Sequence, residues 1–247
     1  MRSYRGPSGD QRLWFDDGEI DTIMEAELCR AGLMPEIDGL PVDIEAFVED
    51  HLEATLDQYA ELPGAILGLT EFAPGAVPAI QLNRDLTGSA MDAEWCPPGI
   101  AGRWRATLAH EGAHVVLHRS LFDIDQGQTS LFEVAEPTDD RLLRCLKRDV
   151  VYRGGSSDWR EVQANRGMAA LLMPKPLFLD AARSRLHDSR PSSIEAATRD
   201  LARVFAVSRE ATAIRLSTLG FRANDGSDLF GDDNPEPPAS PNPISER

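Results

Sequence analysis

The chain has 247 residues and a formal net charge of −16, with 42% hydrophobic and 27% charged residues. This composition is that of an ordinary globular protein, and it excludes a collagen, a coiled coil or a wholly disordered chain. The acidic balance disfavours nonspecific binding to nucleic acid or anionic membrane, because both require a basic surface on the protein.

The N-terminal segment and the cysteines predict a cytoplasmic protein. Residues 1–17 have a basic start but no apolar segment of a secretory signal, and we expect a poorly ordered arm there. No apolar run approaches the ~18 residues of a membrane span. The three cysteines lack CxxC spacing, which is typical of thiols in a reducing compartment. Cys96 lies 14 residues before the first histidine of the motif described below, so a contact between its thiol and a metal stays open.

The first part of the chain contains helical and then extended patterns. Apolar residues recur at near-helical spacing over 18–32, and Gly32 is the expected end of that helix. A second amphipathic helix is predicted over 41–56. Two short apolar segments, 64–72 and 76–83, are separated by a Pro-Gly pair and predict a hairpin or adjacent strands.

Two strong helical patterns lie in the middle of the chain. The first covers roughly 103–120, RWRATLAHEGAHVVLHRS, and the second runs from Asp158 through WREVQANRGMAALL to near Pro174. Residues 121–157 between them are hard to assign. There, LFEVAEP fits a short strand, and DDRLLRCLKRDVV fits a helix or a strand pair.

The C-terminal part predicts a helical module followed by a tail. Two helical patterns within 191–222 have the shape of a helix–turn–helix, with Ser192 and Glu195 fitting a capping box and Ser208 as the second N-cap. Residues 223–247 carry four Asp, two Glu, one Arg and five Pro. Such a segment buries too little apolar surface to offset its ordering entropy, so we expect a disordered tail.

The motif HEGAH at 110–114 is the strongest indication of chemistry. His110 and His114 lie one turn apart on one face of a helix, so both imidazoles can reach one tetrahedral Zn²⁺. Glu111 is one residue further round and can reach a water on the metal rather than the metal itself. In that position it is suited to act as the general base of peptide hydrolysis.

A catalytic zinc site needs a third protein ligand, and the sequence offers several candidates. The metzincin pattern is absent, because Leu117 and Ser120 stand where it requires glycine and histidine. His118, one turn after the motif, is better suited to support or pack beside the ligands. Glu161 on the second helix offers a carboxylate, with the Asn165 amide one turn later able to hold an imidazole. Four acidic residues compete with Glu161 on spacing alone: Glu133, Glu136, Asp139 and Asp140.

Together the two motif helices resemble the ImmA/IrrE family of metallo-endopeptidases. HEGAHVVLH followed by EVQANRGMAALLMP is similar to the family patterns HExGHxxLH and ExxAN…A..LLMP, and the likeness covers about residues 20–222. It implies an α+β, zincin-like fold with a small, mostly antiparallel sheet, the HExxH helix, a second ligand helix and a C-terminal helical hairpin. It also implies Zn²⁺ held by His110, His114 and Glu161, with Glu111 catalytic. The implied role is cleavage of a cognate helix–turn–helix repressor, which would relieve repression of genes.

The sequence also departs from the family pattern. Gly112 and Ala113 stand where the family usually has a larger apolar residue and then glycine, and Gly167-Met168 replaces a common Phe-Ala. The long gap between the motifs indicates an insertion at about 121–157. These departures concern substrate shape more than metal binding. No residue is assigned to stabilise the oxyanion.

We therefore expect an arm at 1–17, a peptidase domain at 18–190, a helical module packed on it at 191–222 and a tail at 223–247. The alternative is a DNA-binding or protein-binding transcriptional regulator that uses the module and has a structural or inactive metal site. Five arginines, against three acidic residues, could then contact phosphates: Arg199, Arg203, Arg209, Arg215 and Arg222. The acidity of the whole chain argues against direct binding to nucleic acid.

Overall fold

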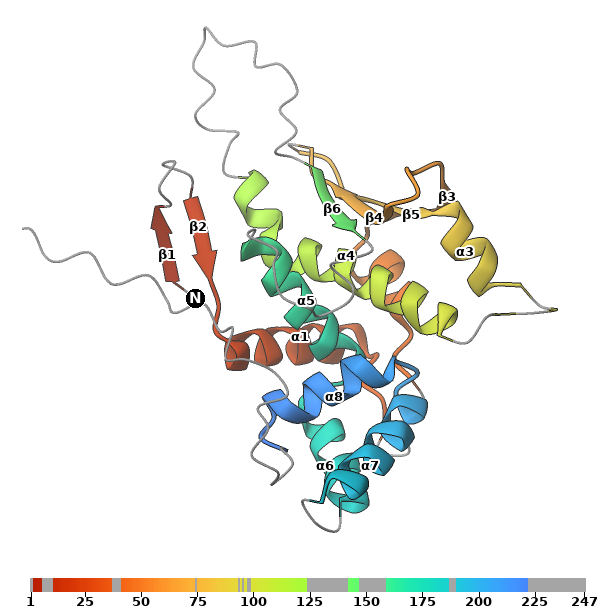
Figure 1. Cartoon of the computed structure of the whole chain (residues 1–247). Helices are drawn as coiled ribbons and strands as arrows, with labels where there is room; N and C mark the ends of the chain where they lie inside the picture. The colour runs from red at the N-terminus through yellow and green to blue at the C-terminus, as the bar shows by residue number, and fades with distance from the viewer. Residues whose placement is uncertain are drawn as a thin grey trace, which may run out of the picture.

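The computed structural model describes residues 2–5, 11–36, 41–73, 75–92, 94, 96, 99–123, 142–146, 159–186 and 190–221. Within these ranges the chain is α+β, as predicted (Figure 1). The elements in chain order are β1 (Arg2–Arg5), β2 (Gln11–Trp14), α1 (Asp17–Ala31), α2 (Ile44–Ala46), the π-helical turn η1 (Phe47–His51), β3 (Thr55–Ala60), β4 (Ile66–Glu71), β5 (Ala79–Asn83), α3 (Arg84–Ala90), α4 (Ile100–Asp123), β6 (Leu142–Leu146), α5 (Trp159–Leu172), α6 (Lys175–Arg185), α7 (Pro191–Val204) and α8 (Arg209–Thr218).

The N-terminal segment contains a ribbon and a well-capped helix. β1 and β2 pair antiparallel, within the segment that the sequence predicts to be an arm. Leu13 at the end of this ribbon and Phe15 after it are buried in the main core. α1 begins with a capping box between Asp16 and Glu19 and ends at Gly32, whose φ of 69° is the left-handed conformation that glycine adopts readily. The predicted end of the first helix is confirmed.

A small mixed sheet has the strand order β3-β5-β4-β6. β4 pairs antiparallel with β5 and with β6, whereas β3 runs parallel to β5. The two predicted strand segments are β4 and β5, which are adjacent and antiparallel as expected. The helix predicted over 41–56 is partly wrong, because it ends at His51 and the chain enters β3 at Thr55.

The central helix α4 packs against the sheet on one side and against α5 on the other, and α1 packs against α5 in turn (Figure 1). α4 and α5 are the two helices predicted to carry the motifs, and both contribute side chains to the main core. Each therefore has an inward face fixed by apolar burial, which sets the direction of its polar motif residues. The functional residues are consequently held by rigid elements rather than by loops.

The C-terminal helices α6, α7 and α8 share a second, smaller core with the end of α5. α7 and α8 match the predicted helical pair, and Ser208 accepts a hydrogen bond from the Ala211 amide as the predicted N-cap. The predicted capping box is wrong, because α7 begins earlier, with Pro191 in its first turn, and Arg190 is its N-cap without a side-chain bond. A buried ion pair connects α8 to α1, with Nη2 of Arg215 2.7 Å from Oδ1 of Asp21. Within the described ranges, none of the helices is both long and apolar enough to span a membrane.

Candidate metal centre

The HEGAH segment lies in the middle of α4, on the faces that turn away from solvent. His110, Glu111 and His114 are all 0% exposed. Uncompensated burial of three polar side chains would cost several kcal/mol, roughly 2 or more for each. Each must therefore meet a partner inside the protein, and the partners come from α5 and β4.

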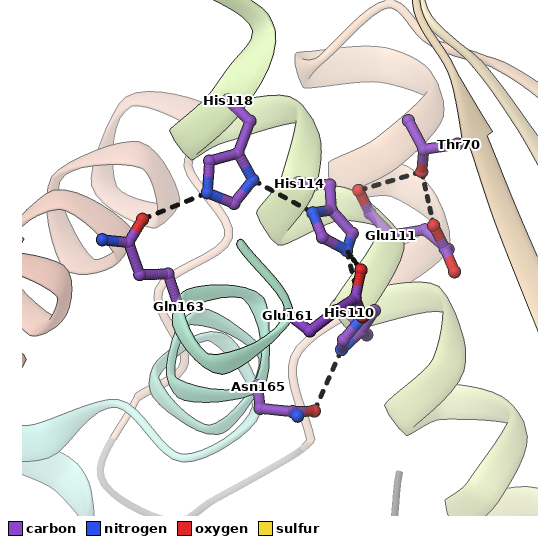
Figure 2. Close-up of polar contacts among 8 residues, drawn as sticks. All are labelled: Thr70, His110, Glu111, His114, His118, Glu161, Gln163 and Asn165. Atoms are coloured by element: carbon purple, nitrogen blue, oxygen red, sulfur yellow. Dashed lines mark hydrogen bonds and ion pairs between the residues drawn. The ribbon is translucent and has the colours of Figure 1, made fainter. Parts of the chain in front are cut away.

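Glu161 of α5 faces both histidines of α4 (Figure 2). Its Oε2 lies 3.1 Å from Nε2 of His110, and its Oε1 lies 3.3 Å from Nε2 of His114. The two Nε2 atoms are 3.1 Å apart. Among the described residues, these three side chains form a group whose ligand atoms all lie within 4.8 Å of one another. Two nitrogens and a carboxylate oxygen thus converge on one point.

Hydrogen bonds on the far sides of the rings show which ring nitrogens are left to face that point. Nδ1 of His110 lies 3.0 Å from Oδ1 of Asn165, an oxygen that can only accept, so Nδ1 of His110 carries a proton and Nε2 is the ring nitrogen left to face that point. The second ring, His114, has its Nδ1 3.0 Å from Nδ1 of His118. Two ring nitrogens and a carboxylate this close to one another are held together by a positive charge among them, which a bound proton or a metal cation can supply. The donor set therefore fits a divalent metal ion.

The electrostatics of the group agree with this fit. Burial alone would raise the pKa of Glu161, but the charge on His114 and hydrogen bonds with both imidazoles hold it well below its ordinary value. Burial lowers the pKa of His110, but the hydrogen bond and charge of Glu161 outweigh burial and raise it. Both directions show that the three side chains favour one bound positive charge, which a proton or a metal cation can supply.

The close approach of the two helices depends on small residues. A Cβ at Gly167 of α5 would lie 2.7 Å from Cβ of Ala113 on α4 and 2.7 Å from Cε of Met24 on α1. Contacts this short are excluded, so only glycine allows α5 to lie this near to α4. Gly167 and Ala113 are two of the departures from the family pattern, and they meet here as a matched pair.

Glu111 lies outside the group of three and faces strand β4. The hydroxyl of Thr70 donates to Oε2 of Glu111 at 2.5 Å, and both side chains are fully buried (Figure 2). Gly68, on the same face of β4, makes room for the carboxylate, because a Cβ there would lie 2.6 Å from Oε1 of Glu111 and 2.8 Å from Cγ2 of Thr107. The strand therefore fixes the position of the Glu111 carboxylate.

Gly68→Ala is expected to displace Glu111 and to leave the three-residue group in place. If Glu111 is the base of a reaction, a displacement near 1 Å lowers turnover roughly 100-fold, while the affinity for metal stays unchanged. Gly88→Ala is the matched control, since no atom beyond its chain neighbours and the backbone of its own helix lies within 4 Å of its added Cβ. Peptidase assays and metal titrations of both variants check this expectation. Equal turnover of the two variants would contradict it.

The other predicted candidates lie outside this group. His118 is 0% exposed and does not belong to it, and its pKa is well below the ordinary value because of burial first and the charge of His114 second. The exposed Cys96 is not in the group either. The four competing acidic residues of the 121–157 segment fall outside the described residues.

Three residues that contact the predicted site residues were not singled out from the sequence: Gly68, Thr70 and Gln163. The first two lie two residues apart in the predicted strand 64–72, so they share one face. That spacing was visible, but nothing in the sequence placed this face against Glu111. Gln163, two residues after Glu161, binds His118 at 3.1 Å.

Comparison with known protein families gives one match over α5 to α8. The Peptidase_M78 model, described as an IrrE N-terminal-like domain, matches residues 156–217. A search of curated proteins found no match. The matched segment carries Glu161 and Asn165, the two residues of α5 that face the histidine pair. It confirms the predicted resemblance of this chain to the ImmA/IrrE family of metallopeptidases.

Proposed function

We propose that this chain is a zinc-dependent endopeptidase that cuts a peptide bond in a partner protein. The observation that carries the proposal is the convergence of His110, His114 and Glu161 on one point, with the buried Glu111 carboxylate on the same helix. The match to a peptidase family over the segment with Glu161 supports it independently of this geometry.

Zinc is the metal that this donor set favours. Two imidazoles and one carboxylate are the protein ligands of one class of catalytic zinc site, in which the fourth position stays open for water or substrate. Cations such as Mg²⁺ and Ca²⁺ prefer sites made of oxygen atoms. When bound, the ion polarises the peptide carbonyl and lowers the pKa of water.

The residues of the chain divide the remaining work. His110, His114 and Glu161 hold the cation, and Asn165 orients the ring of His110 through its Nδ1 proton. Glu111 takes a proton as the water oxygen bonds to the peptide carbon, and it delivers that proton to the amine as the C–N bond breaks. The Thr70 hydroxyl holds the Glu111 carboxylate in place during both transfers.

We further propose that the architecture is zincin-like and that the division at 1–17, 18–190, 191–222 and 223–247 describes its parts. The substrate we propose is a cognate helix–turn–helix repressor, whose cleavage derepresses genes. A DNA-binding repressor presents a basic surface, and the net charge of −16 on this chain favours its approach. Association rates that do not change with ionic strength would argue against this attraction.

The contacts made by arginines of the C-terminal module argue against the alternative of direct DNA binding. Arg215 is 7% exposed and paired with Asp21, so it cannot reach a phosphate. Arg199 lies 3.2 Å from the carboxylate of Glu195, one turn away on the same helix. A gel shift with plain duplex DNA at increasing salt tests this alternative directly.

The central experiment combines metal removal with a cleavage assay. The purified chain is expected to contain one zinc ion per molecule and to cut the repressor encoded beside it at a defined bond, found by mass spectrometry. A chelator should abolish cleavage, and added Zn²⁺ should restore it. A chain that binds no divalent metal contradicts the metallopeptidase assignment. A zinc-loaded chain that leaves the repressor intact contradicts only the substrate.

A further inference from the structure

A chain of buried hydrogen bonds leads from His114 to the N-terminal ribbon, and Figure 2 shows its first part, from His114 through His118 to Gln163. Nδ1 of His114 lies 3.0 Å from Nδ1 of His118, and Nε2 of His118 lies 3.1 Å from Oε1 of Gln163. The Gln163 amide nitrogen donates to the backbone carbonyl of Leu13 in β2 at 2.9 Å. Both histidines and Gln163 are at most 2% exposed, so water does not replace these partners. Trp159 meets the His118 ring edge to face, with ring centroids 5.5 Å apart.

The direction of every hydrogen bond in this series follows from the last acceptor, the backbone carbonyl of Leu13. A backbone carbonyl can only accept, so the Gln163 nitrogen must face Leu13 and the Gln163 oxygen must face His118. That oxygen accepts, so Nε2 of His118 carries the proton and its Nδ1 is bare. A bare Nδ1 on His118 accepts in turn, so His114 carries a proton on Nδ1 and its Nε2 is left to face the metal group.

We infer that His118 and Gln163 are positioning residues that fix the tautomer of His114 and so hold its Nε2 ready for the metal. This inference rests on the proposed function, because the proposed function is what assigns a metal to this site. Neither residue belongs to the metal group, whose members are His110, His114 and Glu161. They act through His114 alone.

The physical reason is the cost of the wrong tautomer. An imidazole with its proton on Nε2 cannot bind a metal through that atom, and in free histidine both neutral tautomers are accessible. At His114 the wrong tautomer would leave two bare Nδ1 atoms facing each other in a buried site. Each buried polar group without a hydrogen bond costs about 1–3 kcal/mol. The metal-binding tautomer therefore depends on a carbonyl 101 residues earlier in the sequence.

Nitrogen-15 NMR of the histidine rings in the metal-free, full-length chain tests the assignment directly. The expected spectrum has a protonated Nδ1 on His114, and a protonated Nε2 with a bare Nδ1 on His118. Gln163→Met keeps a similar volume but removes the amide, and it is expected to release His118 into a mixture of tautomers. A bare Nδ1 on His114 in the unsubstituted chain would overturn the inference.

Zn²⁺ titration against a chelating indicator tests the consequence with two substitutions at one position. His118→Leu places an apolar side chain of similar size in the buried site but offers no acceptor to His114. His118→Asn is smaller and polar, and its Oδ1 replaces Nδ1 as the acceptor. We expect His118→Leu to weaken zinc binding about 10–100-fold, and His118→Asn to recover most of that loss.

A role for His118 in packing alone predicts the opposite order, with leucine tolerated better than asparagine. Equal or tighter zinc binding by His118→Leu would therefore overturn the inference while leaving the metallopeptidase proposal intact. If the unsubstituted chain bound no zinc at all, the proposed function would fail, and the NMR spectrum would still decide the tautomer. Far-ultraviolet circular dichroism of each variant confirms that it is folded before zinc is added.

Discussion

Glu111→Gln is expected to lower the rate of peptide cleavage by about 10²–10⁴-fold, the usual contribution of a general base. The substitution keeps the shape of the side chain, and its amide oxygen can still accept from the Thr70 hydroxyl at the place where the carboxylate now does. It removes the ability to take a proton from water. Since Glu111 lies outside the group of ligand atoms, zinc content should not change.

The measurement is turnover by the zinc-loaded variant beside the unsubstituted chain, with metal content determined on the same samples. Loss of activity with full zinc content identifies Glu111 as the base. A variant that cuts at the unsubstituted rate would eliminate this mechanism. Loss of zinc along with activity would instead mean that Glu111 supports the metal group.

For Glu161→Gln we expect zinc affinity to fall by more than about 100-fold, which exceeds the usual effect of a residue that only orients a ligand. The amide is neutral and offers one oxygen in place of the two that now face Nε2 of His110 and of His114. The carboxylate also supplies the negative charge that favours a cation at this point. Activity should be lost with the metal, and excess zinc should restore part of it.

The chain provides a matched control in a second histidine–carboxylate pair. Nε2 of His51 lies 2.8 Å from Oε2 of Glu27. Among the described residues, this pair is not part of a group of three that could hold a metal ion. Glu27→Gln should therefore leave zinc affinity unchanged, as measured by the same indicator titration. If both substitutions weakened binding equally, the effect would be one of net charge, and Glu161 would not be a ligand.

Local sequence patterns predicted those helix ends that are set by residues close by in the sequence. α1 ends where Gly32 was expected to stop it, and Ser208 caps α8, because caps are set by neighbouring backbone groups. The helix predicted over 41–56 was extended too far for a related reason. Its apolar spacing continues past His51, but the β-branched Thr55 favours a strand, and the pairing of β3 with β5 holds the residues after it in one.

The short helices α3 and α6 were not predicted, because neither has a long apolar periodicity. α3 follows directly after β5, where Asn83 accepts a hydrogen bond from the Asp85 amide and starts the helix. α6 begins immediately after Pro174, a residue that predicts only the end of the preceding helix from the sequence. A proline both ends one helix and fits the start of the next, and the contact of α6 with α7 favours the second role here.

The sequence by itself determined that His110 and His114 share one face of a helix with Glu111 beside it, because positions one turn apart depend only on helical geometry. It could not determine what meets them. Glu161, Thr70 and Gln163 reach that helix through contacts across 51, 41 and 45 residues of sequence. Those contacts exist because α5 and β4 bury apolar side chains against α4. Gly167 and Gly68 allow the backbones to approach closely there. Packing of side chains between distant segments decides such distances, and no local pattern records it.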